Sequence, residues 1–554
     1  MAKYNSIDEL PPVLLEKLSH YFSTPTGDTF VIRNLPCELT GGLLARYSRA
    51  PYSLRLTLAN EFLGDDGEPS AKKGSELMDR VLNAFGDDSV GELEGAHVGL
   101  ERVSQLLTKV VEDRRIGGSP IEQSTRYVRY DQKDRSGKWN YLKPKEVTNA
   151  GFMSEFESLC DNAFELYSKS IPLLSEVFKR QLPEETFQIE VERNGQKTKA
   201  SKSDLEGDTE IKAFKTAYSF TIRCAALDVA RCVLPASTLT QIGLFGNGRF
   251  YTNLISTLKS ENLIEANSRG FDLEQQLKTQ IPTFIKRSAA NPEKRTKDQA
   301  MYSLARTLFE HIEPQTHKVT LLPARDLNTA FLCDALFPYT NISLNQIQTV
   351  VQGLSQGEQK NILNTYVGDR KNRRDRTGRG AETGYPFTFE VVGGFAEYRD
   401  LERHRMMTQQ RQLLTPELGF EIPSEMIELN LESDITDLLE QSNNVYDHMV
   451  SQGHSEAAQY ATLFNHQVRF MMGMNLRELQ HLTELRSQPA GHYSYRDVAQ
   501  KMALQAITEH PWINSILNHV NYTDPGNKIA RASEQAKIAG KNLRTGVEGN
   551  DDLE

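Results

Sequence analysis

Cysteine is scarce in this chain: its 554 residues include only 5 cysteines, and none of them belongs to a CxxC pair. An odd number of scattered cysteines argues against a disulfide framework and against a cysteine zinc site. We therefore expect free, mostly buried thiols and no metal site.

Long apolar segments are also missing. The sequence has no uninterrupted apolar run of about 18 residues, the length that crosses a bilayer. Its start, Met1-Ala2-Lys3-Tyr4-Asn5, has no apolar signal-peptide core. These absences argue against membrane-spanning and secreted proteins, so we predict a cytoplasmic protein without a membrane partner.

An excess of positive charge is absent as well, because 64 Lys and Arg residues face 74 Asp and Glu residues, for a net charge of -10. This balance disfavours broad nucleic-acid binding, so any anion site must be local. The composition, 38% hydrophobic and 25% charged, is typical of a globular chain. The length exceeds what one core usually holds and predicts two domains.

Helical patterns dominate the chain. Apolar residues recur at three- and four-residue spacings in four segments, which are 152–182, 211–234, 439–450 and 454–474. Short β-branched or aromatic runs predict strands at 30–33, 319–322 and 387–392. A hairpin is expected at 190–198, where Asn194-Gly195 favours a tight turn. The fold class is therefore α+β, with a small mixed or antiparallel sheet and long helices in each domain.

Composition also suggests where the domains begin and end. We expect an N-terminal domain at 1–285, with a polar insertion at about 150–210, and a C-terminal domain at 316–520. The charged stretch within 286–315 is the best linker candidate. The last segment, 521–554, is expected to be a mobile tail.

An internal repeat organises the two halves. In the first half, Phe245-Gly246-Asn247-Gly248-Arg249 precedes Lys259 and Arg269. In the second half, Gly473-Met474-Asn475-Leu476-Arg477 precedes Arg486 and Arg496 at the same spacing. The order and character of these segments match, so we infer a divergent tandem duplication.

Two motifs, Ser119-Pro120-Ile121-Glu122-Gln123-Ser124-Thr125-Arg126-Tyr127 and Arg403-His404-Arg405, lie far apart in the chain. Together they resemble the signature of the flavin-dependent (ThyX-type) thymidylate synthases, the thymidylate synthase complementing protein family. That signature reads Arg-His-Arg, two residues, Ser, any residue, Asn, Glu, any residue, Ser, any residue, Arg, Tyr. The first half has Asp113-Arg114-Arg115 in place of Arg-His-Arg, and the second half lacks the Glu, Ser, Arg and Tyr. The losses are complementary.

Further segments extend the resemblance. Ala230-Arg231-Cys232-Val233-Leu234-Pro235 is similar to the family's Ala-Arg-x-x-Leu-Pro helix end, and Asn475-Leu476-Arg477-Glu478-Leu479 is similar to its Asn-Ala-Arg-Ser-Leu segment. Phe85-Gly86-Asp87-Asp88-Ser89-Val90-Gly91-Glu92-Leu93 resembles its Gly-His-x-Ser-Val-x-Glu-His segment, with both histidines replaced. The resemblance covers roughly 30–275 and 318–500, so the fold would be two divergent ThyX-like domains in tandem.

The resemblance implies a function for the whole chain. It implies methylation of dUMP to dTMP, with methylenetetrahydrofolate as carbon donor and FAD, reduced by NADPH, as hydride donor. In the family each site lies between subunits of a homotetramer. A single hybrid site built from both halves would therefore suit this chain, and a homodimer would reproduce the four-domain assembly. The alternative assembly is a monomeric pseudo-dimer.

The resemblance also implies roles for individual residues. The substrate-binding residues would be Ser119, Glu122, Ser124, Arg126, Tyr127, Arg477 and Arg496. The residues that contact FAD would be Arg403, His404, Arg405, Glu122 and Asn475. Arg496 and Arg477 would be catalytic, and Arg496 would stabilise the negative charge that develops on the uracil ring.

Elementary chemistry supports some of these roles and offers plainer ones. Arginine is a permanent, bidentate phosphate donor, although a lone arginine usually pairs with a surface carboxylate. His404 between two arginines is expected to be neutral and to donate to a flavin edge. Gly117-Gly118 would let backbone N–H groups approach an anion. Ser119-Pro120-Ile121-Glu122 is also a helix capping box, so Glu122 has a structural alternative.

Two other functions stay open. Asp400 stands where the family usually has Gln, and both upstream histidines are replaced, so the substrate could be another pyrimidine nucleotide. A degenerate duplicate that binds nucleotide or folate as a sensor, or acts as a scaffold, is the nonenzymatic alternative.

Overall fold

The chain forms two compact units in a computed structural model that describes residues 4–64, 68–79, 91–370 and 377–546. The first unit contains 1–101, 110–122 and 241–294, and the second contains 102–109, 123–240 and 295–554. These units differ from the expected domains 1–285 and 316–520, because residues 123–240 group with the C-terminal half. Backbone pairing explains the grouping: Pro235 bridges Leu463, and Ala236 N donates to Thr462 O at 2.8 Å.

The first unit begins with short helices. Their bounds are α1 (Pro12–Tyr21), α2 (Cys37–Tyr47), α3 (Leu54–Thr57) and α4 (Ala71–Asp79). Leu18, Phe22, Leu39, Leu43 and Leu58 are all buried in one apolar cluster of this region. The expected strand at 30–33 is wrong, because it is reduced to an isolated bridge between Ile32 and Phe22.

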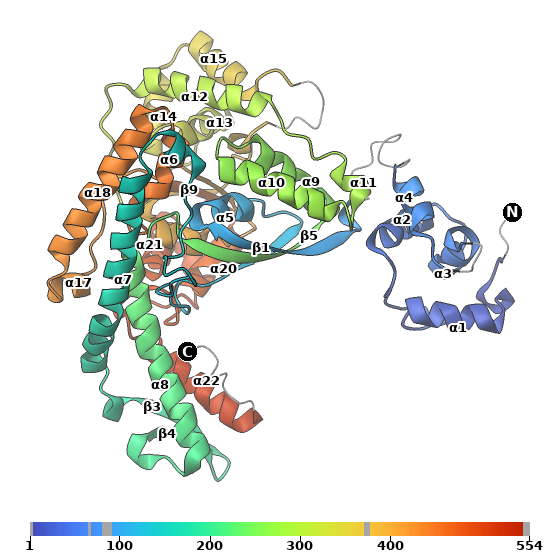
Figure 1. The fold of residues 1–554 in the computed structure, drawn as a ribbon, viewed down its shortest axis with the longest axis horizontal. Coiled ribbons are helices and arrows are strands. Elements are labelled where there is room, and N and C mark those ends of the chain that lie inside the picture. The colour runs from blue at the N-terminus through green and yellow to red at the C-terminus, as the bar shows by residue number, and fades with distance from the viewer. Residues whose placement is uncertain (1–3, 65–67, 80–90, 371–376, 547–554) are drawn as a thin grey trace. The chain divides into compact units, whose positions relative to one another are not determined.

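A three-stranded sheet follows in the order β1-β5-β2, and Figure 1 labels its strands β1 and β5. Its strands are β1 (Gly95–Ser104), β2 (Gly118–Glu122) and β5 (Leu239–Asn247), and the neighbouring helices are α5 (Gln105–Glu112), α9 (Gly248–Ser260), α10 (Ile264–Leu277) and α11 (Pro282–Ile285). β2 and β5 are antiparallel, with Gly118 opposite Gly246 and Glu122 opposite Ile242. The helix expected from the capping box at 119–122 is therefore wrong, since this segment is a strand.

The second unit contains a four-stranded sheet in the order β6-β7-β9-β8. Its strands are β6 (Val319–Leu321), β7 (Phe387–Gly394), β8 (Thr408–Arg411) and β9 (Gln467–Met474). β6 and β7 confirm the strands predicted at 319–322 and 387–392. The helix expected at 454–474 is wrong beyond its first residues: β9 pairs with β7 and β8, and seven of its eight residues are buried. A strand covered on both faces is continuously apolar, so it carries no two-residue alternation.

The two sheets repeat one topology. β1-β5-β2 and β7-β9-β8 have the same order along the chain and across the sheet. The central strand of each leads to an asparagine N-cap: Asn247 Oδ1 accepts from Phe250 N at 2.8 Å, and Asn475 Oδ1 accepts from Glu478 N at 3.0 Å. The helices after them are α9 and α20 (Leu476–Arg486). This correspondence supports the tandem repeat inferred from the sequence.

Long helices and a hairpin complete the second unit. α7 (Met153–Gln181) and α8 (Gly207–Ala230) match two predicted helices, and α18 (Glu432–Ser451) contains a third. β3 (Gln188–Arg193) and β4 (Gln196–Ser201) confirm the predicted hairpin, with left-handed φ angles of 55° at Asn194 and 76° at Gly195. The remaining helices are α6 (Lys145–Asn149), α13 (Leu327–Leu336), α14 (Leu344–Gly353), α15 (Gln356–Val367), α16 (Phe395–Leu401), α17 (Ser424–Glu428), α19 (Ser455–Ala458) and α21 (Tyr493–Glu509).

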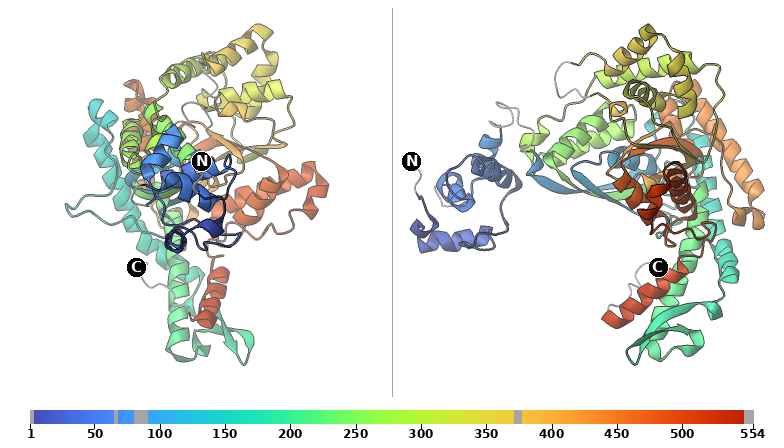
Figure 2. Two further views of the ribbon diagram at one scale, coloured as in Figure 1. Left: turned by 90° about the vertical axis from the view of Figure 1, so that its right-hand side faces the viewer. Right: turned by 180° about the vertical axis from the view of Figure 1, so that it is seen from behind.

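Two segments expected to be irregular are helical. α12 (Glu293–Phe309) occupies most of the expected linker at 286–315 and buries Met301 and Ala305. α22 (Ala532–Thr545) occupies the expected tail at 521–554 and lies beside α8 and the β3–β4 hairpin (Figure 2). Residues 547–554 lie outside the described part of the chain. In both segments the apolar residues at helical spacing are few, and the many polar residues around them favour a prediction of irregular structure.

Two composition-based expectations can be compared with the structure. Four of the five cysteines are buried, and Cys37 is half-buried. Across the described ranges, we find no helix with the length and apolar character needed to cross a bilayer.

Candidate active site

The segment after β2 belongs to the second unit from Gln123 onward. Its residue Thr125 is buried and contacts two arginines. Thr125 Oγ1 accepts from Arg231 Nη1 at 3.0 Å and from Arg399 Nη1 at 3.4 Å. Arg231 comes from the turn after α8, in the first half of the chain, and Arg399 comes from α16, in the second half. Ser124 Oγ closes the local turn by accepting from Arg126 N at 3.2 Å. The nucleotide motif of one half therefore meets an arginine of the other.

Arg126 is buried and paired. Its Nε and Nη2 donate to the two oxygens of Asp228 at 2.7 and 2.8 Å, and its Nη1 donates to Tyr495 Oη at 2.8 Å. Burial alone would raise the pKa of Asp228, but the Arg126 guanidinium holds that pKa well below its usual range. The plainer expectation, an arginine paired with a carboxylate, therefore applies to Arg126, although the carboxylate is buried rather than at the surface.

Asp400 on α16 is a second buried carboxylate that pairs with an arginine. Asp400 Oδ2 lies 3.2 Å from Arg231 Nη2. Burial opposes its ionisation, but Arg231, Arg403 and Arg126 together hold the pKa of Asp400 well below its usual range. Within the described ranges, the Nε atom of Arg231 is buried and has no hydrogen-bond acceptor. The cluster thus keeps a buried cationic N–H group without an acceptor, which suits an anionic ligand.

His492 is a neutral member of the same cluster. Its Nδ1 accepts from Ser494 N at 3.2 Å, so the proton is on Nε2, which donates to Asp228 O at 3.1 Å. Burial and the positive charge of Arg231 lower the pKa of His492 to about 3. The imidazole therefore holds the backbone at Asp228 without adding charge.

His404 has both ring nitrogens engaged. A guanidinium N–H can only donate, so Nε2 of His404 must accept from Arg486 Nε at 2.8 Å. The proton is consequently on Nδ1, which donates to Glu478 Oε1 at 2.8 Å. Burial and Arg486 lower the pKa of His404 against the opposing effect of Glu478. The expected neutral imidazole agrees with this geometry, but the ring has no N–H left to donate to a flavin edge.

A metal does not suit this histidine, although His404, Glu478 and His481 place one ligand atom each within 4.8 Å of one another. A metal on Nδ1 would displace the proton bonded to Glu478 while Nε2 still accepts from Arg486. The ring would then have to be an imidazolate, which neutral imidazole ligands avoid. Glu478, His404 and Arg486 are better described as a hydrogen-bonded chain, and His481 Nδ1 lies 3.6 Å from Glu478 Oε2 beside it.

Other residues expected to bind FAD or substrate are exposed and lie close to His404 or Glu478 in the sequence. Arg403, Arg405 and Arg477 are exposed, and they adjoin His404 or Glu478 in the sequence. Among the described residues, Arg477 forms no hydrogen bond or ion pair. Asn475 is exposed too, but its side chain caps α20. Exposed, permanent cations of this kind fit the pyrophosphate of a dinucleotide.

Arg496 does not belong to this group. It is 1% exposed, and it donates to Ser487 O at 3.3 Å, to Thr523 Oγ1 at 3.1 Å and to Asn527 O at 3.4 Å. Its guanidinium is therefore saturated by loop oxygens that belong to the protein. The cation beside His404 is Arg486, which ends the helix begun by the Asn475-Leu476-Arg477 motif.

The remaining predicted residues lie in the first unit or have structural contacts. Ser119 is exposed and Glu122 is buried on β2, in the first unit. Gly117 has a φ of 80°, and a Cβ at Gly118 would lie 2.3 Å from Phe250, so the glycines serve the turn and its packing. Gly91, Glu92 and Leu93 are described, whereas Phe85 to Val90 of the same motif lie outside the described residues.

The cations of α9 and α10 are paired within the first unit. Lys259 Nζ lies 2.8 Å from Glu274 Oε2, and Arg269 Nη1 lies 3.4 Å from Asp272 Oδ2. Both residues therefore have the structural role that lone cations usually have.

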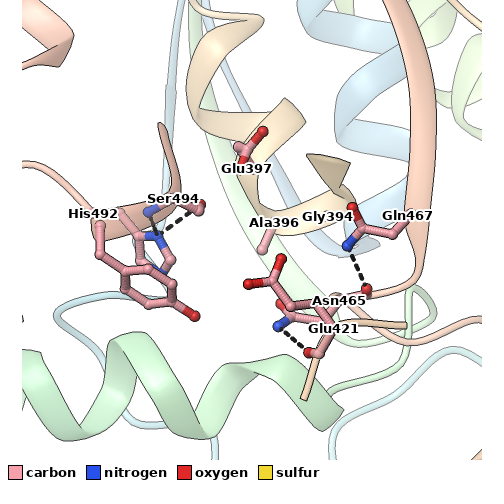
Figure 3. Close-up of a pocket in the computed structure, with 9 residues that line it drawn as sticks. Gly394, Ala396, Glu397, Glu421, Asn465, Gln467, His492 and Ser494 are labelled. Atoms are coloured by element: carbon pink, nitrogen blue, oxygen red, sulfur yellow. Dashed lines mark hydrogen bonds between the residues drawn. The ribbon is translucent and has the colours of Figure 1, made fainter. Parts of the chain in front are cut away.

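His492 also lines a small pocket (Figure 3). Its lining residues are Gly394, Ala396, Glu397, Glu421, Asn465, Gln467, His492, Tyr493 and Ser494. Glu397 is buried, its Oε2 lies 3.3 Å from Lys318 Nζ, and burial raises its pKa. The amide N atoms of Asn465 and Gln467 bond backbone oxygens, as the dashed lines show. Acceptor atoms dominate this lining, so the pocket does not suit a phosphate.

Comparison with known proteins gives two consistent results. The model of a family described as "Thymidylate synthase complementing protein" matches residues 43–269 and 381–512. A UPF0159 protein of Chlamydia pneumoniae is 36% identical over 531 residues, which cover 92% of this chain and 94% of the relative. A UPF0159 protein of Chlamydia muridarum (strain MoPn / Nigg) is 34% identical over 533 residues, 92% and 95% of the two chains. A UPF0159 protein of Thermoplasma acidophilum is 31% identical over 515 residues, 91% and 99%.

Proposed function

Because the chain belongs to the thymidylate synthase complementing protein family, we propose that it is a FAD-dependent thymidylate synthase with one hybrid site. It would convert dUMP to dTMP with methylenetetrahydrofolate as carbon donor and NADPH-reduced FAD as hydride donor. One observation carries the proposal: Thr125, inside the nucleotide motif of the first half, accepts hydrogen bonds from Arg231 and from Arg399 of the second half. The motif that the first half retains and Arg399 of the second half are thus parts of one charged cluster.

The charge of this cluster supports an anionic substrate. Arg126 and Arg231 are each paired with one carboxylate, while the Nε–H group of Arg231 remains buried without an acceptor among the described residues. A phosphate would accept from such N–H groups, and each charge-assisted bond contributes about 1.5–3 kcal/mol. Ser124 would add a hydroxyl donor on the same turn.

Arg403, Arg405 and Arg477 would hold FAD by its pyrophosphate. When bound, the flavin supplies the redox chemistry of the reaction. His404, with both ring nitrogens engaged, orients Arg486 rather than touching the cofactor as a donor. Arg486 lies 5.5 Å from the ring centroid of Tyr495 and is therefore part of the cluster around Arg126. We assign to Arg486 the stabilisation of developing negative charge that the sequence suggested for Arg496.

One observation favours a nonenzymatic alternative, a nucleotide or folate sensor or scaffold. Arg126 and Asp228 form a bidentate pair, and Asp400 pairs with Arg231, so the cluster is largely closed. Opening a buried ion pair leaves its partner uncompensated, which costs about 3–5 kcal/mol. Asp400 is also occupied by Arg231, so a uracil contact from this residue would need rearrangement. Another pyrimidine nucleotide remains the alternative substrate.

An anaerobic assay separates these functions. The purified, FAD-supplemented chain would be mixed with dUMP, methylenetetrahydrofolate and NADPH, and dTMP would be followed by chromatography. We expect dTMP from the wild type, and formation of dTMP about 10²–10³-fold more slowly by the Arg486→Ala variant. Flavin oxidation without dTMP would indicate another substrate, and nucleotide binding by a colourless protein would indicate a sensor.

A further inference from the structure

The C-terminal segment that follows α21 is fixed to the second unit by buried side chains. Gln500 Nε2 donates to Asn521 O and to Thr523 O, both at 2.8 Å. Arg496 Nη2 donates to Thr523 Oγ1 at 3.1 Å, and its Nη1 donates to Asn527 O. These bonds from α21 set the course of the segment from 521 to 531, which ends at α22.

Arg531 lies at the end of this course and is 5% exposed. Its Nη2 donates to Ala490 O at 2.5 Å, and its Nη1 donates to Tyr127 Oη at 3.2 Å. The guanidinium carbon is 5.2 Å from the centroid of the Tyr127 ring. Within the described part of the chain, no carboxylate forms an ion pair with Arg531. A buried guanidinium without a counter-ion is costly, because its charge is neither solvated nor neutralised.

A second cation shares the same acceptor. Arg126 Nη2 donates to Ala490 O at 3.3 Å, so the guanidinium groups of Arg126 and Arg531 are near neighbours. Asp228 neutralises only one of them. Tyr127, whose hydroxyl accepts from Arg531, is 36% exposed, so Arg531 adjoins a side chain that reaches solvent. An uncompensated positive charge beside a solvent-exposed side chain suits an anion.

We propose that Arg531 is an additional phosphate-binding residue, which the C-terminal segment adds to the nucleotide motif at Ser124 to Tyr127. Residue 531 lies beyond both parts of the chain that match the family model. The proposal rests on the proposed function for the identity of the ligand, a nucleoside monophosphate, but not for its charge. In this proposal Arg496 is a positioning residue, because it bonds the segment that carries Arg531.

Nucleotide titrations of the full chain test the proposal. Arg531→Gln keeps a hydrogen-bonding side chain and removes the charge. We expect it to weaken dUMP binding by about 10- to 100-fold, the loss of one charge-assisted phosphate contact, and to leave binding of deoxyuridine unchanged. Arg544→Gln, the same change at the far end of α22, should leave both affinities unchanged. Equal losses for dUMP and deoxyuridine, or unchanged dUMP affinity, would overturn the role of Arg531.

Inorganic phosphate separates this proposal from the proposed function. If the wild-type chain does not bind dUMP, the proposed function fails. Arg531 can still be judged, because phosphate should raise the melting temperature of the wild type and not that of Arg531→Gln. Equal phosphate stabilisation of both would overturn the anion site. If Arg531→Gln does not fold, Arg531→Lys keeps the charge without the planar fork and should weaken dUMP binding about tenfold; unchanged binding there would also contradict the proposal.

Discussion

The two repeats share a scaffold and differ in what their charged side chains contact. In each, the central strand ends at an asparagine that caps the next helix, α9 or α20. Lys259 at the end of α9 and Arg269 in α10 bond acidic neighbours of the first unit. At the end of α20, Arg486 bonds His404, which bonds Glu478. Duplication has therefore kept the backbone of both repeats, while the unusual hydrogen-bonding chemistry is found in the second unit.

The largest effect on stability should follow from breaking the buried ion pair between Arg126 and Asp228 in the second unit. Arg126→Ala leaves Asp228 buried and uncompensated, so we expect a loss of about 3–5 kcal/mol in the free energy of unfolding, together with loss of activity. Arg269→Ala, the first-repeat control, removes a partly exposed pair and should cost less than about 1 kcal/mol. Urea denaturation measures both. Similar values for the two variants would remove the distinction between the repeats.

Arg486 and Lys259 extend the comparison to catalysis. Arg486→Ala should lower kcat by about 10²–10³-fold, the usual effect of losing one preorganised electrostatic donor, with native stability nearly preserved. Lys259→Ala should lower stability, because Lys259 is buried and bonds Glu274, and leave kcat unchanged in the folded fraction. Steady-state kinetics beside thermal melts provide the test. A loss of kcat in Lys259→Ala but not in Arg486→Ala would contradict the catalytic role of Arg486 and the structural role of Lys259.

The pH dependence of stability should carry a signature of His492. Its pKa in the folded protein is lowered to about 3, whereas the unfolded value is about 6.5. Between these values the unfolded state binds the additional proton, so stability present above about pH 6.5 is lost as pH falls toward 3, by up to about 1.4 kcal/mol per pH unit. His492→Gln should lose this component of the slope. Unfolding curves at pH 7, 6 and 5 compare the two proteins, and parallel slopes would contradict the buried neutral imidazole.

The smallest effect concerns the orientation of Arg486. Glu478→Gln keeps the shape of the side chain but replaces the charged acceptor of the His404 Nδ1–H with a neutral one, which holds the ring less firmly. We expect about a tenfold loss in kcat/KM, while ¹⁵N NMR of His404 shows a weaker hydrogen bond at Nδ1 and the same tautomer, because Nε2 still accepts from Arg486. Glu274→Gln at Lys259 is the matched control and should not change kcat/KM. A full rate with a weakened hydrogen bond at Nδ1 would mean that Glu478 does not position Arg486.

Local sequence patterns were sufficient for some elements. The hairpin at Asn194-Gly195 follows from backbone preferences alone, and the β-branched and aromatic run at β7 indicates a strand. β9 was assigned to a helix, because a central strand buried on both faces has no alternation. The expected domain boundaries could not anticipate the pairing of Pro235 with Leu463, a contact between distant parts of the chain.

The candidate site shows the same limit. The motifs identified Arg126 and His404, but not their partners Asp228 and Glu478, which come from other helices. Arg486 and Arg496 are the same residue type in the same repeat. Only the packing of the C-terminal segment shows that Arg496 is saturated by backbone oxygens and Arg486 is not.

The stoichiometry of nucleotide binding tests the hybrid site most directly. Isothermal titration of the full chain with dUMP counts the sites without requiring turnover. A site assembled from complementary remnants of both repeats predicts one dUMP per chain. Two dUMP per chain, one for each repeat, or no binding at all would contradict the hybrid site.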